Sequence, residues 1–180
     1  MPHRRLTLAL AALCLLLPLG ALARDLPLER IELPPGFSIA VYAEVPEARS
    51  LALGPNGIVF VGSMRRGTVS ALVPRADGQA QTVVLAKGLN APNGVAFRDG
   101  ALYVAEVGRI LRYDGIETRL RTPPRPAVVT ERYPNDFHHG WKFIAFGPDG
   151  RLSIPVGAPC NICPPPGPLH ATITRLDVAG

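Results

Sequence analysis

Three segments of the chain repeat one pattern of apolar and polar positions. Each is an apolar run, a polar turn and a second apolar run: RSLALGPNGIVFVG from Arg49, NGVAFRDGALYVAE from Asn93 and KFIAFGPDGRLSIPVG from Lys142. The turns end in glycines at similar intervals: Gly57, Gly100 and Gly150. Apolar runs of this length bounded by turn residues predict β-hairpins, and an interval of roughly 40 to 50 residues is typical of β-propeller blades.

Further strands follow each hairpin. Third strands are expected at 68–73, 110–113 and 171–176, and fourth, outer strands at 81–86 and 127–130. The inner strands are apolar at nearly every position, as expected where blades pack against neighbours on both faces. No sustained 3.6-residue apolar period occurs after the first 23 residues, and 20 prolines with 18 glycines make the chain rich in turns. We therefore predict an all-β fold of about three antiparallel four-stranded blades.

The ends of this pattern leave the ring open. The segment FSIAVYAE, 37–44, alternates like an outer strand that would complete a last blade. Three blades are too few for a ring, which takes four to eight. We interpret 37–180 as a partial, N-terminal propeller domain whose free sheet edges are prone to pairing. A complete small open sandwich is the competing interpretation.

The N-terminal 23 residues predict a cleaved export signal. A basic segment, His3 to Arg5, precedes an apolar run over 6–19, and Ala21-Leu22-Ala23 has the form of a cleavage site. The run is too short for a membrane span, so no stable membrane insertion is expected after cleavage. The domain organisation expected is a signal peptide at 1–23, a linker at 24–36 and the propeller, in the periplasm or secreted.

Charge excludes one class of partner. The formal net charge of +5 becomes +3 when Arg4 and Arg5 leave with the signal peptide. The remaining arginines and lysines are scattered along the chain, and no nucleic-acid-binding module is recognisable. We therefore expect a solvated surface and no nucleic-acid partner.

Two candidate chemical clusters flank the third hairpin. His138 and His139 precede it, and Cys160 and Cys163 follow it. Paired histidines ahead of a strand are often only hydrogen-bonded loop residues. In an oxidising compartment, two cysteines three apart tend either to pair or to hold a metal. Pro164 rather than histidine follows Cys163, so covalent haem attachment is not indicated.

Two long strings carry a family resemblance. GLNAPNGVAFRDGALYVAEVGRILRYD and HHGWKFIAFGPDGRLSIPVGAPCNIC closely resemble the sorbosone dehydrogenase group of the glucose/sorbosone dehydrogenase family. The resemblance extends from about Leu33 to Gly180. It implies a six-bladed propeller, here incomplete, that oxidises a sugar or related alcohol with pyrroloquinoline quinone (PQQ) and calcium. The calcium ligands and the cations that hold the quinone's carboxylates are expected outside this chain, so no metal ligand is assigned.

The same resemblance implies roles for three residues. Counting back from the Gly147 turn, the family's general base falls on His139, and an imidazole that titrates near neutrality suits removal of a hydroxyl proton. Asn93 lies where the family contacts quinone and sugar, although an Asn-Gly turn is an equal explanation. His138 is a candidate contact to cofactor or substrate. Trp141 fits the core better than a stacking platform.

The family pattern is not fully reproduced. In glucose-oxidising members an acid precedes the base, where this chain has His138, and another acid follows the hairpin's closing glycine, where Ala158 follows Gly157. An imidazole without a carboxylate partner is less firmly held in one tautomer. Either another group orients His139 or the reaction differs. The location of Cys160 and Cys163 favours a disulfide that stiffens the adjacent loop.

Three functions remain open at this point. The first is an exported quinoprotein dehydrogenase, and the chain alone is expected to be inactive because part of a ring cannot enclose a cofactor. The second is a calcium-dependent lactonase-type propeller, for which Glu106 is the only obvious carboxylate. The third is a non-catalytic ligand-binding propeller. The substrate and the electron acceptor are not specified by the sequence.

Overall fold

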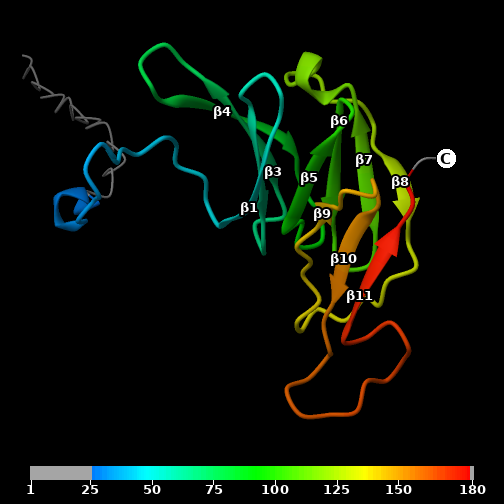
Figure 1. Cartoon of the computed structure of the whole chain (residues 1–180). Helices are drawn as coiled ribbons and strands as arrows, with labels where there is room; N and C mark the ends of the chain where they lie inside the picture. The colour runs from blue at the N-terminus through cyan, green and yellow to red at the C-terminus, as the bar shows by residue number, and fades with distance from the viewer. Residues whose placement is uncertain (1–25, 179–180) are drawn as a thin grey trace, which may run out of the picture. The chain divides into compact units, whose positions relative to one another are not determined.

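The structure is a computed structural model that describes residues 26–178. The chain divides into two units, Met1–Ala40 and Val41–Gly180. Within the first, the described residues contain one short 3-10 turn, Leu28–Arg30. The second unit holds three antiparallel β-sheets (Figure 1). The predicted all-β, partial propeller fold is confirmed, and the predicted signal peptide lies outside the described residues.

The first blade has four strands in the order of the sequence. β1 and β2 form the first predicted hairpin, and β3 and β4 are the predicted third and outer strands. Their bounds are Ala48–Leu53, Val59–Ser63, Val69–Pro74 and Ala80–Ala86. Burial is complete or nearly so in β2 and at the start of β3, whereas only one position of β4 is buried, which distinguishes a strand between two others from an edge strand.

The second blade repeats the arrangement. β5 to β8 again pair antiparallel in sequence order, and every position of β6 is buried. Their bounds are Gly94–Arg98, Ala101–Ala105, Ile110–Asp114 and Ala127–Thr130. A 3-10 turn, Ile116–Thr118, follows β7 and buries Ile116.

The third blade contains three strands within the described residues. β9 spans Ala145–Phe146, β10 spans Leu152–Val156 and β11 spans Thr172–Leu176. β9 pairs only with Leu152 and Ser153, so the ladder on that side ends before Pro155. On the other side the pairing of β10 with β11 continues past Pro155 to Val156. The proline therefore limits one ladder of the two.

Packing between blades gives the core its two parts. Phe60 of β2 stacks on Phe97 of β5 at 5.4 Å within an apolar cluster between blades 1 and 2. Tyr103 of β6 meets Phe146 of β9 edge to face at 5.0 Å within a second cluster between blades 2 and 3. Since β5 contacts both β1 and β9, the inner strands of the three blades lie together at the propeller axis (Figure 1).

Glycine makes this approach of the inner strands possible. A Cβ at Gly62 would collide with the backbone of Pro92 and Asn93, and one at Gly94 would collide with the carbonyl of Lys142. Because those obstacles are backbone atoms, they have little freedom to yield. The two glycines thus set the distance between successive blades near the axis.

One predicted strand is not formed. Residues 37–44 are not in a strand, although the Ala80 amide of β4 donates a hydrogen bond to the Tyr42 carbonyl at 2.9 Å. Alternating polarity favours an extended conformation, but a strand also needs a partner along its length. No helix in the described part of the chain is long and apolar enough to cross a membrane.

Candidate active site at the propeller axis

His139 lies in the turn that leads into the third blade. Its backbone has a φ of +55°, a left-handed conformation that is uncommon for a residue other than glycine. Gly157 packs against it so closely that a Cβ there would collide with the His139 backbone carbonyl. The hairpin's closing glycine therefore fixes the position of the imidazole. Strained backbone held by its surroundings in this way is a feature of functional sites.

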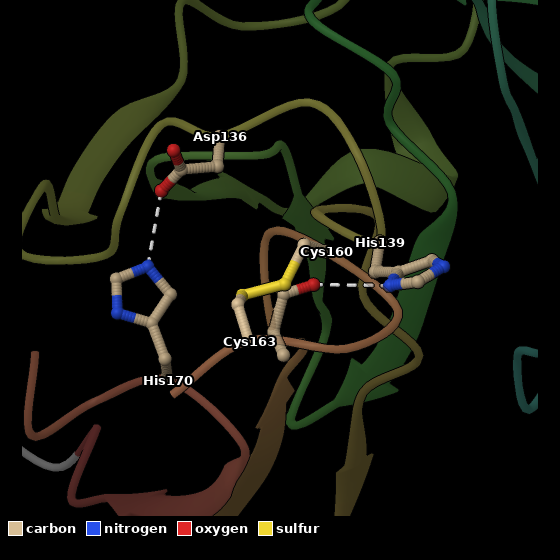
Figure 2. Close-up of a disulfide and its surroundings, with 6 residues drawn as sticks. Asp136, His139, Cys160, Cys163 and His170 are labelled. Atoms are coloured by element: carbon tan, nitrogen blue, oxygen red, sulfur yellow. Dashed lines mark hydrogen bonds and ion pairs between the residues drawn. A yellow bond between two sulfur atoms is a disulfide. The ribbon is translucent and has the colours of Figure 1, made fainter. Parts of the chain in front are cut away.

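The His139 ring is oriented by a backbone carbonyl. Its Nδ1 lies 3.0 Å from the carbonyl oxygen of Ala158 (Figure 2). A carbonyl oxygen can only accept, so this bond requires the proton on Nδ1 and leaves the Nε2 lone pair free. Ala158 is the residue at which the family's orienting acid is missing. The main chain of the same residue supplies the acceptor that its side chain lacks.

A disulfide closes the loop that carries this carbonyl. Cys160 and Cys163 are bonded, with their Cα atoms 6.0 Å apart, as the sequence favoured. Farther along the loop, Nε2 of His170 lies 3.0 Å from Oδ2 of Asp136, which belongs to the segment before His139. In Figure 2 the disulfide lies between the His139 and His170 contacts. The loop is thus attached to the histidine-bearing segment at two points.

His138 is exposed, and its ring centroid lies 3.9 Å from that of His139 at an interplanar angle of 37°. No hydrogen bond to its side chain is made within the described part of the chain. The structure therefore gives His138 contact with the imidazole of His139, and its contact with a cofactor stays a prediction.

Asn93 is buried between the three inner strands. Its Nδ2 donates to the carbonyl of Lys142 at 2.8 Å, and its Oδ1 accepts from Nε of Arg49 at 3.1 Å. Its backbone carbonyl also accepts from the Ser50 amide at 3.4 Å. One amide side chain therefore links blades 1, 2 and 3. A role in contacting quinone stays a prediction, and the observed role is to place Arg49.

A cavity of about 600 Å³ opens beside these residues. It is lined by parts of all three blades: Ala48, Arg49, Ser50, Leu51, Asn93, Trp141, Phe143 and Pro155. The His139 ring meets the ring of Trp141 edge-on at 6.0 Å, so the imidazole neighbours one residue of the cavity wall, although His139 is not itself a lining residue. Trp141 was expected in the core, but it is only half-buried and forms part of the wall. The indole of Trp141 is therefore accessible from the cavity.

Lys142 is the unexpected charged group of the site. Its side chain is 1% exposed, and its Nζ donates to the carbonyls of Val107 and Gly140, the latter at 2.8 Å. The ammonium also lies 5.5 Å from the centroid of the Tyr133 ring. Burial without a carboxylate partner lowers the pKa of Lys142 to about 8. The lysine joins blade 2 to the turn that carries His139.

No group of three or more His, Cys, Asp or Glu side chains within residues 26–178 is arranged to hold a metal ion. Glu106, the carboxylate considered for a lactonase-type site, is buried and accepts from the Asn90 amide and the Arg109 guanidinium. It is not among the residues that line the axial cavity.

Sequence reasoning missed three parts of this site. Arg49 was read only as the first residue of a hairpin, and Lys142 as the start of a strand. The Ala158 carbonyl has no signature, because every residue carries one. The one usable signal was spacing: Arg49, Asn93 and Lys142 hold equivalent positions at the start of the three repeats, so a propeller places them together.

Comparison with known proteins agrees with this architecture. No protein-family model matches the sequence, and no curated protein matches it significantly. Among solved structures, the PQQ domain of pyranose dehydrogenase from Coprinopsis cinerea aligns with a TM-score of 0.55 and 16% identity, over 64% of this chain and 29% of that one. PQQ-bound aldose sugar dehydrogenase from Streptomyces coelicolor aligns with a TM-score of 0.51 and 21% identity, over 67% and 41%.

The chain spans less than half the length of either protein. At these identities the likeness concerns the fold, and it agrees with the resemblance found in the sequence. The chain therefore shares its propeller fold with part of two PQQ-binding sugar dehydrogenases.

Proposed function

We propose that the chain forms part of an exported quinoprotein dehydrogenase that oxidises a sugar or a related alcohol or aldehyde. The observation that carries the proposal is the oriented imidazole of His139 next to a cavity with a cationic and aromatic wall. The shared fold supports the same class of activity. Export rests on the predicted signal peptide and places the enzyme in the periplasm or outside the cell.

The cavity wall fits an anionic, planar quinone. Arg49 contributes a guanidinium that has no carboxylate partner within residues 26–178, and Nε of this group is held by Asn93. Trp141 and Phe143 contribute aromatic rings, and Phe143 is exposed. A guanidinium suits a carboxylate, and aromatic rings suit a planar conjugated ligand. Arg49, Trp141 and Phe143 are therefore the residues of this chain proposed to hold the cofactor. Calcium stays an expectation from the family resemblance.

The proton chemistry belongs to His139. PQQ, when bound, supplies the two-electron acceptor for the hydride that leaves the substrate carbon. Nε2 of His139, with its lone pair free, accepts the proton of the substrate hydroxyl, while Nδ1–H stays bonded to Ala158. The carbonyl of Ala158 stabilises the resulting imidazolium less than a carboxylate does.

Turnover tests the proposal. Aldose oxidation is measured with PQQ and calcium added, both on this chain and on any longer product of its reading frame, the chain alone being expected to be inactive. The change His139→Gln should lower kcat by about 10²- to 10⁴-fold, because general-base catalysis contributes that much, and should leave quinone binding intact. Quinone-independent lactone hydrolysis, or a His139→Gln enzyme with unchanged kcat, would contradict the proposal.

A further inference from the structure

A second cavity, of about 340 Å³, lies beside blade 2. It is lined mainly by polar side chains from the β6–β7 turn, the loop before β5 and the segment after β8: Asn90, Glu106, Gly108, Arg109, Glu131, Tyr133 and Asn135. None of these residues lines the axial cavity. The two cavities are therefore separate sites.

The floor of the second cavity is a buried, oriented carboxylate. Glu106 is 2% exposed. Its Oε1 accepts the Asn90 backbone amide at 2.6 Å, and its Oε2 accepts Nε of Arg109. Arg109 also lies 3.7 Å from the Glu131 carboxylate. The pKa of Arg109 is raised, chiefly by its hydrogen bond to Glu106. The arginine thus remains charged and fixed between two acids.

The walls offer both donors and acceptors. Nδ2 of Asn90 donates to Oδ1 of Asn135 at 3.3 Å, which leaves Oδ1 of Asn90 and Nδ2 of Asn135 without a hydrogen bond in the described part of the chain. The hydroxyl of Tyr133 is bonded to Thr174 at 2.9 Å. Because this hydroxyl is already hydrogen-bonded, Tyr133 presents its aromatic ring to the cavity. Gly108 keeps the space open, because a Cβ there would press on Asn135.

The charges and hydrogen-bonding groups of this cavity disfavour three classes of ligand and suit a fourth. A bound divalent cation prefers six or more oxygens and is opposed by the Arg109 guanidinium. An anion is opposed by Glu106 and Glu131, and an apolar ligand would leave the amides unpaired. A neutral molecule with many hydroxyls can pair with acceptors and donors together, while its C–H face lies on an aromatic ring. We propose that this cavity binds a neutral hexose unit or a similar polyol.

The proposal does not depend on quinone chemistry. The two cavities share no lining residue. Lys142, which lines neither, links their surroundings: its ammonium donates to the carbonyl of Val107, next to Glu106 and Gly108, and to the carbonyl of Gly140, next to Trp141. The loop from Asn90 to Asn93 contributes its first residue to one cavity and its last to the other. A sugar held beside blade 2 thus leaves the axial cavity free for a second ligand.

Chemical-shift titration of the full chain tests this directly. D-glucose and maltose are added to ¹⁵N-labelled protein, with CaCl₂ and sodium phosphate as separate titrations. We expect saturable shifts at the backbone amides of Asn90, Gly108 and Asn135, with roughly millimolar affinity as for a small polar ligand in an open cavity. Saturation by calcium or phosphate and not by sugar, or no saturable shift at these amides, would overturn the proposal.

Two variants locate the binding. Asn135→Ala removes an exposed amide and Glu131→Ala an exposed carboxylate, so both should fold. Each should weaken sugar binding about fivefold or more, since a lost hydrogen bond is worth roughly 1 kcal/mol. Asn161→Ala, on the exposed disulfide loop, is the matched control and should bind as the parent does. Equal affinity in all three variants would contradict the site even if the sugar binds elsewhere.

Discussion

The two contacts between blades differ in chemistry. Between blades 1 and 2 the buried cluster is apolar and contains the stacked pair of Phe60 and Phe97, while the buried Asn93 adds hydrogen bonds to Arg49 and Ser50 beside it. Between blades 2 and 3 the cluster of strand residues is apolar as well, but this contact also buries the charged Lys142, whose ammonium donates to the carbonyls of two turn residues, Val107 and Gly140. Burying polar groups costs free energy unless they are paired. The difference indicates that the first contact serves stability and that the second also positions His139.

The largest effect on stability is expected when a buried side chain is removed from the apolar contact between blades 1 and 2. Phe60 is fully buried, so Phe60→Ala should lower the free energy of unfolding by about 3 to 5 kcal/mol through lost burial and an unfilled cavity. Denaturant unfolding with and without the change measures it. Phe143→Ala, at an exposed ring, is the control and should cost far less. Similar losses in the two variants would refute the assignment of the core.

The polar contact should respond to pH. Because the pKa of Lys142 is about 8 in the folded chain and higher when unfolded, the cost of burying its charge is full below pH 8 and is relieved as pH rises. The free energy of unfolding of the parent, relative to Lys142→Met, should therefore increase by up to ~3 kcal/mol between pH 8 and 10.5. A pH-independent difference between the two proteins would contradict the lowered pKa.

Asn93 tests whether the three blades are linked at the axis. Asn93→Ala leaves the Lys142 carbonyl and Arg49 without their partner, so it should lower the free energy of unfolding by about 2 kcal/mol. Asn161→Ala, an exposed asparagine on the disulfide loop, should change it by less than about 0.5 kcal/mol. Equal effects would mean that the buried hydrogen bonds contribute nothing.

The smallest expected effect on stability concerns the disulfide. A closed loop this short should contribute about 2 kcal/mol or less, so the double change Cys160→Ser with Cys163→Ser should be mild. Its larger consequence is on His139, whose Nδ1 proton depends on the Ala158 carbonyl of the same loop. ¹⁵N chemical shifts of the ring report the tautomer. The parent should show the tautomer with the proton on Nδ1, and the variant should show a mixture of the two tautomers. The same tautomer in both proteins would contradict the idea that the disulfide holds the Ala158 carbonyl in place.

The hairpins could be predicted because the sequence of each strand and turn is itself characteristic of a hairpin. The apolar runs around Gly57, Gly100 and Gly150 and the glycine turns between them are local features, and the structure has a hairpin at each. The segment 37–44 is not a strand in this structure for the complementary reason: its alternation is local, but a strand needs a partner, and the last blade that it was expected to complete is not among the three sheets of the described residues.

The site was less predictable than the fold. His139 was found through spacing and a family pattern, yet the group that orients it is the backbone of Ala158, which no residue type reveals. Lys142 reads as a surface residue, and its burial depends on two carbonyls brought from separate turns. Trp141 was assigned to the core because aromatic residues usually pack there, whereas the turn at Gly140 directs it toward the axial cavity.

The central claim is that the axial cavity holds a quinone beside His139, and the chain's single tryptophan provides a direct probe. Trp141 lines this cavity, so titration with PQQ should quench its fluorescence saturably. Arg49→Ala should weaken the binding about tenfold or more through loss of a charge-assisted hydrogen bond. Absence of saturable quenching, or quenching that Arg49→Ala leaves unchanged, would contradict the account.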